Sequence, residues 1–260
     1  MDLQLNGKTA LVTGATAGIG LAIATRLAAE GSHVVVAGRS KEKLDASLAL
    51  IGTGERRGIV ADPATAEGAA ILLRELPEVD ILVNNLGIYE SKPYGDITDE
   101  DWRRFFEINV LSGARIARQY FPGMLARDWG RIIFIASESG LMIPPDMIHY
   151  GMTKTAQLAI SRGLAALTKG TRVTVNSVLP GTTRSEGIED FLKSVAEDPK
   201  APMAEIEAGF FRTERSTSLI QRMIEPEEVA SLVAYVASPL SSATNGAALR
   251  VDGGITPTIA

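Results

Sequence analysis

Short runs of β-branched and aliphatic residues alternate with stretches of helical periodicity along most of the 260-residue chain. Several of these runs are apolar throughout, which is expected for strands of a parallel sheet that helices cover on both faces. Such alternation is typical of βαβ units, so the pattern predicts an α/β fold with a doubly wound parallel sheet. The seven predicted strands are Thr9–Thr13, Val34–Ala37, Arg57–Ala61, Ile81–Val83, Arg131–Ala136, Val173–Val178 and Ala248–Val251.

The segments between these runs carry apolar residues at the spacing of a helix. Ile19, Ile23 and Leu27 lie four residues apart, and we expect this stripe to pack on the sheet. Thr98 followed by Asp101 resembles a capping box, which predicts the start of a helix.

One long stretch, Gly181–Glu225, departs from the alternation. It is polar and without a strand pattern, with short helical patterns around residues 191–192 and 210–211. Connections of this length are often lids or binding loops. We expect a single domain over residues 1–260, in which residues 181–225 form a substrate lid that is mobile without ligand. A fixed surface excursion or a subunit contact is the alternative.

The composition is that of an ordinary globular protein, with 45% hydrophobic and 22% charged residues. The net charge of −5, without a block of Lys and Arg, argues against a nucleic-acid partner. No apolar run approaches the roughly 18 residues that span a bilayer, and the N-terminus lacks the features of a signal peptide. We therefore expect no membrane contact and a cytoplasmic location. With no cysteine and two histidines, we also expect no metal site.

A glycine-rich loop lies between the first predicted strand and the first helix. Gly14, Gly18 and Gly20 are spaced Gly-x3-Gly-x-Gly within Thr13–Gly20. Glycines at this place allow the backbone to approach a pyrophosphate, and the helix that follows offers free N–H groups and the positive end of its dipole. The alternative is a tight strand-to-helix turn that needs only small residues.

The end of the second strand indicates which dinucleotide is bound. An acidic residue there would bond the adenosine ribose hydroxyls and repel a 2′-phosphate, but this chain has Arg39 and Ser40. A guanidinium and a hydroxyl suit a phosphate, so NADP(H) is favoured over NAD(H), which stays possible. The alternative for Arg39 is a solvated side chain at a strand end.

Tyr150 and Lys154 are four residues apart in a helical pattern, which places the phenol and the ammonium on one face. A nearby cation favours the phenolate form and so lowers the pKa of a tyrosine, which is about 10 when the residue is isolated. Ser137 follows the strand predicted at 131–136, at the edge of the sheet where α/β proteins bind ligands. The three residues together predict an acid–base site.

These features occur in the order and spacing of the short-chain dehydrogenase/reductase family, which the chain resembles over nearly its whole length. The resemblance implies a Rossmann-type fold and the compact form of the family, which includes 3-oxoacyl-acyl-carrier-protein reductases and sugar or steroid dehydrogenases. It also implies a homotetramer or dimer formed through the two long helices after the fourth and fifth strands. The matching segments are Thr13–Gly20, Asn84–Gly87, Asn109, Ser137, Tyr150–Lys154, Asn176, Pro180–Gly181 and Val251–Gly254.

The resemblance assigns roles to four residues. Tyr150 would be the acid in carbonyl reduction and the base in alcohol oxidation, and Ser137 would bond the substrate oxygen. Lys154 would hold the nicotinamide ribose and lower the pKa of Tyr150. Asn109 would anchor a proton-relay water through the lysine, whereas without the other matches it would be an ordinary polar helix residue.

The cofactor contacts follow from the motifs and the resemblance together. Asp62 would meet the adenine, and the turn at 180–182 would contact the nicotinamide carboxamide. Leu86 departs from the family, which mostly has alanine there, and residues 181–225 are longer than in the fatty-acid reductases. The predicted cofactor-binding residues are Gly14, Thr16, Gly18, Ile19, Gly20, Arg39, Ser40, Asp62, Asn85, Gly87, Tyr150, Lys154, Pro180, Gly181 and Thr182.

The main interpretation is an enzyme that transfers a hydride between a nicotinamide and a small-molecule carbonyl or secondary alcohol. A non-catalytic NAD(P)-binding sensor on the same fold is the alternative, because fold alone does not determine function. Glu138, next to Ser137, suggests a second carboxylate acid, or else a side chain that is solvated or paired with an arginine. His149 adjoins Tyr150, and we expect it to be a packing or pocket-wall residue.

Overall fold

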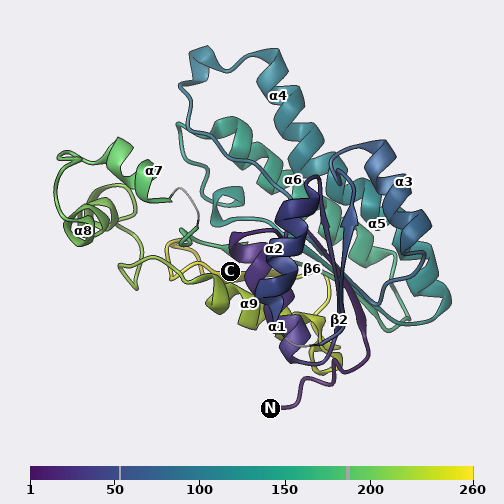
Figure 1. The fold of residues 1–260 in the computed structure, drawn as a ribbon. Helices are drawn as coiled ribbons and strands as arrows, with labels where there is room; N and C mark the ends of the chain where they lie inside the picture. Colours follow the sequence, from purple (N-terminus) through teal and green to yellow (C-terminus); the bar gives the residue numbers. More distant parts are fainter. Residues whose placement is uncertain (53, 186–187, 260) are drawn as a thin grey trace.

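A seven-stranded parallel sheet forms the centre of the protein (Figure 1), in a computed structural model that describes residues 1–52, 54–185 and 188–259. The strand order is β3-β2-β1-β4-β5-β6-β7, and every neighbouring pair is parallel. The predicted α/β fold with a doubly wound parallel sheet is therefore confirmed. The strands are β1 (Thr9–Thr13), β2 (His33–Gly38), β3 (Arg56–Val60), β4 (Ile81–Asn84), β5 (Gly130–Ile135), β6 (Val173–Pro180) and β7 (Ala248–Val251).

All seven predicted strands are present, with ends that differ by one or two residues. The largest difference is in β6, which continues through Pro180 and pairs there with Val251 of β7. A proline lacks the N–H that a ladder uses, but Pro180 is the last residue of its strand, where that donor is not needed.

Helices connect the strands and cover the sheet. The capping box predicted at Thr98 and Asp101 is present at the start of α4. The helix after it continues through a π-helical turn, η2 (Glu107–Leu111), directly into α5. The α-helices are α1 (Gly18–Ala29), α2 (Lys41–Ile51), α3 (Ala66–Glu75), α4 (Asp99–Phe106), α5 (Ser112–Ala126), α6 (Ile148–Ala166), α7 (Ile188–Val195), α8 (Met203–Thr213) and α9 (Pro226–Ala237), and the short 3₁₀ turns are η1 (Tyr94–Asp96), η3 (Glu138–Gly140) and η4 (Pro239–Ser241).

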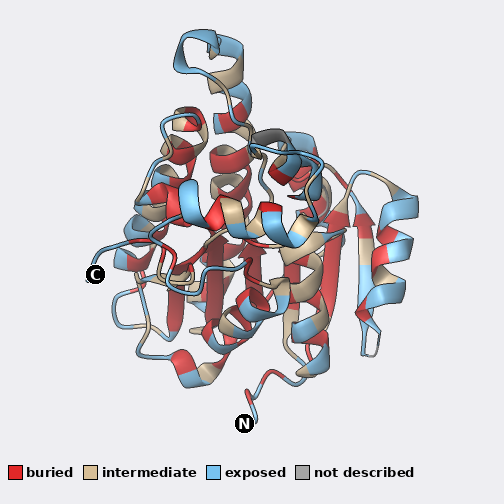
Figure 2. Ribbon diagram, turned by 90° about the vertical axis from the view of Figure 1, so that its left-hand side faces the viewer, coloured by how far each residue is buried: buried red, intermediate tan, exposed pale blue. Residues whose placement is uncertain are grey.

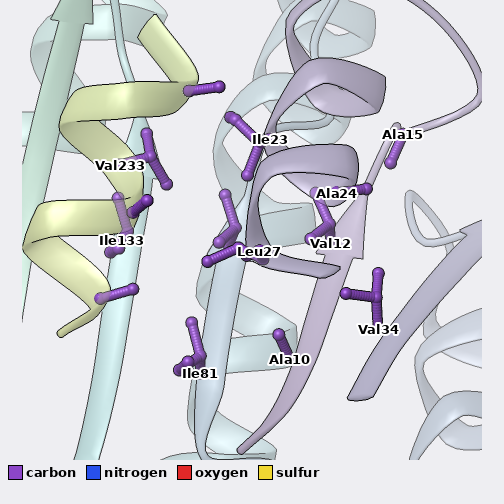
Figure 3. Close-up of a cluster of buried hydrophobic side chains, with 14 of the residues drawn as sticks. Ala10, Val12, Ala15, Ile23, Ala24, Leu27, Val34, Ile81, Ile133 and Val233 are labelled. Atoms are coloured by element: carbon purple, nitrogen blue, oxygen red, sulfur yellow. The ribbon is translucent and has the colours of Figure 1, made fainter. Parts of the chain in front are cut away.

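Each face of the sheet buries its own apolar cluster, because successive side chains of a strand point to opposite faces. In β1, Ala10 and Val12 pack against α1 and α9, whereas Leu11 packs in the second cluster with α3, α5 and α6. Figure 3 shows Val12 close to Ile23 and Leu27 of α1, the stripe that the sequence predicts. Buried residues accordingly concentrate in the strands and on the sheet-facing sides of the helices (Figure 2).

The order of the strands places a crevice at one edge of the sheet. From β1 the chain moves outward to β2 and β3 and then returns to β4 on the other side of β1. The connections after β1 and β4 therefore diverge above the carboxyl ends of these strands, which is where such folds bind their ligands.

Residues 181–225 form a small helical layer of their own. The expected helical patterns correspond to α7 and α8, which lie apart from the sheet in Figure 1. The segment is strand-free among the described residues except for one isolated bridge between Thr183 and Ile224. Its apolar side chains bury one another rather than joining either face of the sheet, so its stability depends on a third, smaller cluster. That cluster comprises Ile188, Leu192, Ile206, Phe210, Phe211 and Met223.

Among the residues that the structure describes, none of the helices combines the length and apolar character needed to cross a bilayer. Nor do three His, Cys, Asp or Glu side chains gather there into a set that would hold a metal ion.

Candidate active site

A cleft of about 620 Å³ opens at the carboxyl ends of the strands. Its walls come from the glycine-rich loop, the segments after β4, β5 and β6, the first turns of α6, and residues 181–225. It brings together eleven of the predicted site residues, although they span most of the chain. These are Gly18, Ile19, Gly20, Asn85, Gly87, Ser137, Tyr150, Lys154, Pro180, Gly181 and Thr182.

The glycine-rich loop requires glycine at its predicted positions. Gly14 and Gly18 have φ values of 62° and 53°, in the left-handed region that other residues rarely adopt. A Cβ at Gly20 would clash with the carbonyl oxygen of Gly14 and the amide of Asn85. The loop is therefore a tight strand-to-helix turn that needs small residues, as in the alternative interpretation.

The amino end of α1 has no side-chain cap, unlike the amino ends of α2, α3 and α4. The N-caps Ser40, Thr65 and Thr98 accept hydrogen bonds from the first turns of α2, α3 and α4. The N-cap of α1 is Ala17, which has no such side chain, and this helix has no acidic residue in its first turn. Its N–H groups and the positive end of its dipole thus face the cleft uncapped, which fits the pyrophosphate of a dinucleotide.

Asn85 joins this loop to the end of β4. Its side-chain amide donates to the carbonyl oxygens of Thr13 and Gly14, at 3.1 and 3.0 Å. The Thr13 hydroxyl accepts in turn from the backbone N–H groups of Asn85 and Leu86. Leu86 is therefore held through its backbone, which a bulky side chain does not prevent. The role of Thr13 escaped the sequence analysis, because its partners lie more than 70 residues away.

The residues predicted to meet the adenosine end lie beyond the cleft. Arg39 is exposed just after β2. Ser40 caps α2, and its hydroxyl also donates to Glu42 at 2.8 Å. Asp62 accepts from the backbone N–H of Ala64 in the turn after β3. Arg39 therefore has no hydrogen-bond or ion-pair partner among the described residues, whereas Ser40 and Asp62 already have partners.

Ser137, Tyr150 and Lys154 converge at the middle of the cleft, and all three are buried or nearly so. The Lys154 ammonium lies 5.6 Å from the centre of the Tyr150 ring and donates to the carbonyl oxygen of Ile135 at 2.9 Å. Ser137 follows β5 directly, so its position is set by the sheet, whereas the other two are set by the first turns of α6. The helical spacing thus places the phenol and the ammonium together as expected.

Burial dominates the titration of this group. It raises the pKa of the Tyr150 phenol above its usual value, and the hydrogen bond with Ser137 opposes that effect. Burial also lowers the pKa of Lys154 to about 8, although the charge of Glu138 acts in the opposite direction. The expected lowering of the Tyr150 pKa by Lys154 is not found: desolvation disfavours the charged form of both side chains, and the negative charge of Glu138 raises the pKa of Tyr150 further. The phenol keeps its proton, as an acid must.

Asn109 is buried in the π-helical turn between α4 and α5, a kind of turn often found at functional sites. Its side chain bonds both the N–H and the carbonyl oxygen of Ile88 and also reaches Thr153 of α6. These bonds tie the segment after β4 to α6. Asn109 is therefore more than an ordinary polar helix residue, and a Cβ at Gly87 would lie 3.5 Å from both it and Lys154.

The connection from Asn109 to Lys154 runs through a residue that the sequence analysis missed. Gln157 donates from Nε2 to the backbone carbonyl of Asn109 at 2.6 Å, and its Oε1 lies 3.3 Å from the ammonium of Lys154. Gln157 therefore links the backbone of Asn109 to the ammonium of Lys154, and the proton-relay water that the resemblance implies stays a prediction. The signal was present, because Gln157 lies one helical turn after Lys154 on the same face.

Two neighbours of the catalytic candidates have different surroundings. His149 is buried with its ring 4.1 Å from that of Phe105, and neither ring nitrogen has a hydrogen-bond partner among the described residues. It is a packing residue, one of the two expected roles. Glu138 is only 5% exposed, and its Oε2 accepts from the Ser137 hydroxyl at 2.6 Å. Of the alternatives for Glu138, a solvated side chain is therefore wrong.

Known proteins resemble this chain over nearly its whole length. The short chain dehydrogenase family matches residues 8–195. The uncharacterised oxidoreductase YvaG of Bacillus subtilis (strain 168) is 51% identical over 259 residues, which cover 98% of each chain. The 3-oxoacyl-acyl-carrier-protein reductase FabG of Escherichia coli (strain K12) is 33% identical over 257 residues, covering 97% of this chain and 99% of that protein.

A solved structure extends the similarity to three dimensions. L-Sorbose reductase from Gluconobacter frateurii, complexed with NADPH and L-sorbose, matches all of this chain and all of its own, with a TM-score of 0.92 and 29% sequence identity. The family match covers more than half of the chain, and relatives of at least 30% identity cover nearly all of it. The chain is thus an oxidoreductase that belongs to the short-chain dehydrogenase/reductase family.

Proposed function

We propose that this oxidoreductase interconverts a carbonyl and a secondary alcohol with NADP(H), and that Tyr150 exchanges the proton. The observation that carries the proposal is the convergence of Ser137, Tyr150 and Lys154 in the cleft that also receives the uncapped amino end of α1. One end of the cleft fits a pyrophosphate and the other holds an acid. A bound dinucleotide would span the cleft, with its pyrophosphate at the first end and its nicotinamide beside the acid.

The side chains have separable roles in carbonyl reduction. The cofactor, when bound, supplies the hydride. Tyr150 donates its proton to the substrate oxygen, and the raised pKa keeps that proton in place until then. Ser137 donates a hydrogen bond to the same oxygen as negative charge develops on it. Lys154 holds the nicotinamide ribose and is positioned by Ile135 and Gln157.

The experiment is a turnover assay of the purified protein with NADPH and NADH against ketones and aldehydes, followed through the absorbance of the reduced nicotinamide. We expect oxidation of NADPH that depends on the carbonyl compound. Tight binding of NADPH with no turnover of any carbonyl or alcohol would instead support the sensor.

The preference for NADP(H) rests on Arg39, which is exposed at the carboxyl end of β2, where an acidic residue would favour NAD(H). That the solved neighbour is complexed with NADPH supports the same choice. Ser40 contributes less than the sequence suggests, because its hydroxyl already bonds Glu42 and the backbone of α2.

Arg39→Ala is expected to raise the Kd for NADPH by roughly 10-fold to 100-fold and to change that for NADH by less than about threefold. A charge-assisted contact with the 2′-phosphate exists for one cofactor only. Both constants are measured by fluorescence titration, with Arg56→Ala as the control, because Arg56 is an exposed arginine of the adjacent strand. Equal weakening of NADPH and NADH binding would show that Arg39 is a solvated side chain with no contact to the 2′-phosphate.

We further propose that residues 181–225 act as a lid over the nicotinamide end of the cleft. Phe191 of α7 and Phe210 and Arg215 of the α8 region line the cleft, so the segment already reaches the site. Its two ends are joined by the bridge between Thr183 and Ile224 and by the ion pair of Arg184 with Glu225 at 3.0 Å. A separate small core on a narrow base suits movement as a unit, which would exclude water during hydride transfer.

In hydrogen exchange, amides of α7 and α8 are expected to exchange faster than those of β4 in the cofactor-free protein. We expect NADP(H) and substrate together to slow them by about tenfold or more, since closing adds contacts to a segment whose own apolar core is small. Amides of α9 are the control, because they pack on the sheet and have no part in closing. If amides of α7 and α8 are already as protected as those of β4 before ligand is added, residues 181–225 are a fixed surface segment and not a lid.

We also propose a homo-oligomer, a tetramer or dimer, formed through the helix that runs from α4 to α5 and through α6. Light scattering of the purified protein measures its mass, and a monomer at micromolar concentration would contradict the proposal.

A further inference from the structure

The carboxylate of Glu138 has no role in the proposed reaction, although it lies in the cleft. A carboxylate is seldom buried unless it has partners. This one is buried at the floor of the cleft, beside the two residues that would act on the substrate oxygen. The Ser137 hydroxyl donates to its Oε2 at 2.6 Å. Burial raises the pKa of Glu138, and the Ser137 hydrogen bond and the positive charge of Arg215 oppose that effect.

The hydrogen that Glu138 receives is the same one that the reaction requires. A serine hydroxyl has one hydrogen, so Ser137 cannot donate to Glu138 and to the substrate oxygen at the same time. When Ser137 turns to the substrate, the Glu138 carboxylate loses its side-chain donor inside a buried site and keeps only the backbone N–H groups of Glu138 and Ser139. A buried carboxylate that loses a donor is destabilised, so the complex is favoured when the substrate supplies a replacement.

Arg215 faces the same space from the lid side. It lines the cleft together with Glu138, and its side chain lies over the ring of Phe210, 5.5 Å from the ring centre. Its Nη1 donates to the carbonyl oxygen of Glu214, but its buried Nε has no hydrogen-bond partner within the described part of the chain. No ion pair between Arg215 and Glu138 is found among the described residues within 4.0 Å, so each has bonding capacity left for a third group.

We propose that Glu138 and Arg215 form a subsite for a hydroxyl group on the carbon next to the reacting carbon, so that the substrates are α-hydroxy ketones and the corresponding vicinal diols. A hydroxyl is the group that donates to a carboxylate and accepts from a guanidinium at once. An adjacent carboxylate in the substrate is disfavoured, because it would stand against Glu138. This inference rests on the proposed function, since it assumes that Ser137 bonds the reacting oxygen.

The test compares two ketones that differ by one hydroxyl, 1-hydroxybutan-2-one and butan-2-one, with 2-oxobutanoate as the anionic third probe. We expect wild-type kcat/KM with NADPH to be about 30-fold or more higher for the hydroxy ketone, because a site built to bond a hydroxyl rejects the analogue that lacks it. The ratio of the two values is the readout, so a general loss of activity in a variant does not affect the comparison.

Glu138→Ala and Arg215→Met are each expected to reduce this ratio to within about threefold of one. The second variant is informative because Arg215 comes from a different part of the chain, just after α8. Glu90→Gln is the matched control: Glu90 also lines the cleft, but it is already ion-paired with Arg104 at 2.7 Å. The control should keep the wild-type ratio, and NADPH binding verifies that each variant is folded.

The outcomes separate the inference from the proposed function. Equal kcat/KM for the two ketones in the wild type, a preserved ratio in Glu138→Ala, or a preference for 2-oxobutanoate would overturn the subsite while leaving the oxidoreductase reaction in place. Absence of turnover with every carbonyl and alcohol would overturn the proposed function, and the subsite with it.

Discussion

Tyr150→Phe is expected to lower kcat by roughly 10³-fold or more and to leave the Kd for NADPH within about twofold of wild type. The substitution removes the proton that the proposed reaction transfers to the substrate oxygen and almost no volume, so the cleft keeps its shape. The tyrosine is partly buried, desolvation raises the pKa of its phenol, and a hydrogen bond with Ser137 opposes that rise. Single-turnover kinetics with NADPH measure the chemical step apart from product release.

Tyr89→Phe is the matched control for this experiment. Tyr89 lines the same cleft and meets Tyr150 edge to face, with the ring centres 6.4 Å apart, but it is 56% exposed. A tyrosine that only shapes the cleft should lose little when its hydroxyl is removed, so we expect a change below about fivefold. Similar losses in both variants, or turnover of Tyr150→Phe within a few-fold of wild type, would remove Tyr150 from the role of acid.

Lys154→Met is expected to abolish turnover and to raise the Kd for NADPH by at least about tenfold, because in the proposed reaction one ammonium holds the nicotinamide ribose and supports the acid. Its effect on stability should be small in comparison. Burial lowers the pKa of Lys154 from 10.5 to about 8, which corresponds to a penalty of about 3 kcal/mol for the buried charge. The variant removes that penalty but leaves the acceptors on Ile135 and Gln157 without their donor, at a cost of about 1–3 kcal/mol.

The two effects nearly cancel, so the free energy of unfolding at pH 7 should lie within about 2 kcal/mol of wild type. The lowered pKa of Lys154 also predicts how the stability of the wild type changes with pH. Between pH 8 and 10.5 the unfolded chain binds the Lys154 proton while the folded protein releases it, and stability rises with pH wherever this holds. Wild type should therefore gain stability relative to Lys154→Met across this range in urea unfolding. A constant difference from pH 7 to pH 10 would contradict the lowered pKa.

The local parts of this protein were predictable from its sequence. The strands follow from short apolar runs, and Thr98 with Asp101 determines where α4 begins. The contact between Tyr150 and Lys154 follows from helical spacing, because residues four apart lie on the same side of a helix. The catalytic and cofactor roles of these residues stay predictions, which the experiments above test. What the sequence determines in each case is a relation between residues a few positions apart.

Other properties of the site depend on segments that meet only in the folded protein. Gln157 is an unremarkable helix residue in sequence, and it becomes a link in the site because Asn109, 48 residues earlier, presents a carbonyl oxygen to it. The sequence left Glu138 open between solvation, pairing and acid catalysis. Its burial depends on the packing of η3 against α6 and β6, and the approach of Arg215 to the same cleft depends on how residues 181–225 fold. The pKa of Tyr150 also depends on both levels. Helical spacing predicts a nearby cation, but only the packed structure determines how far the phenol is desolvated.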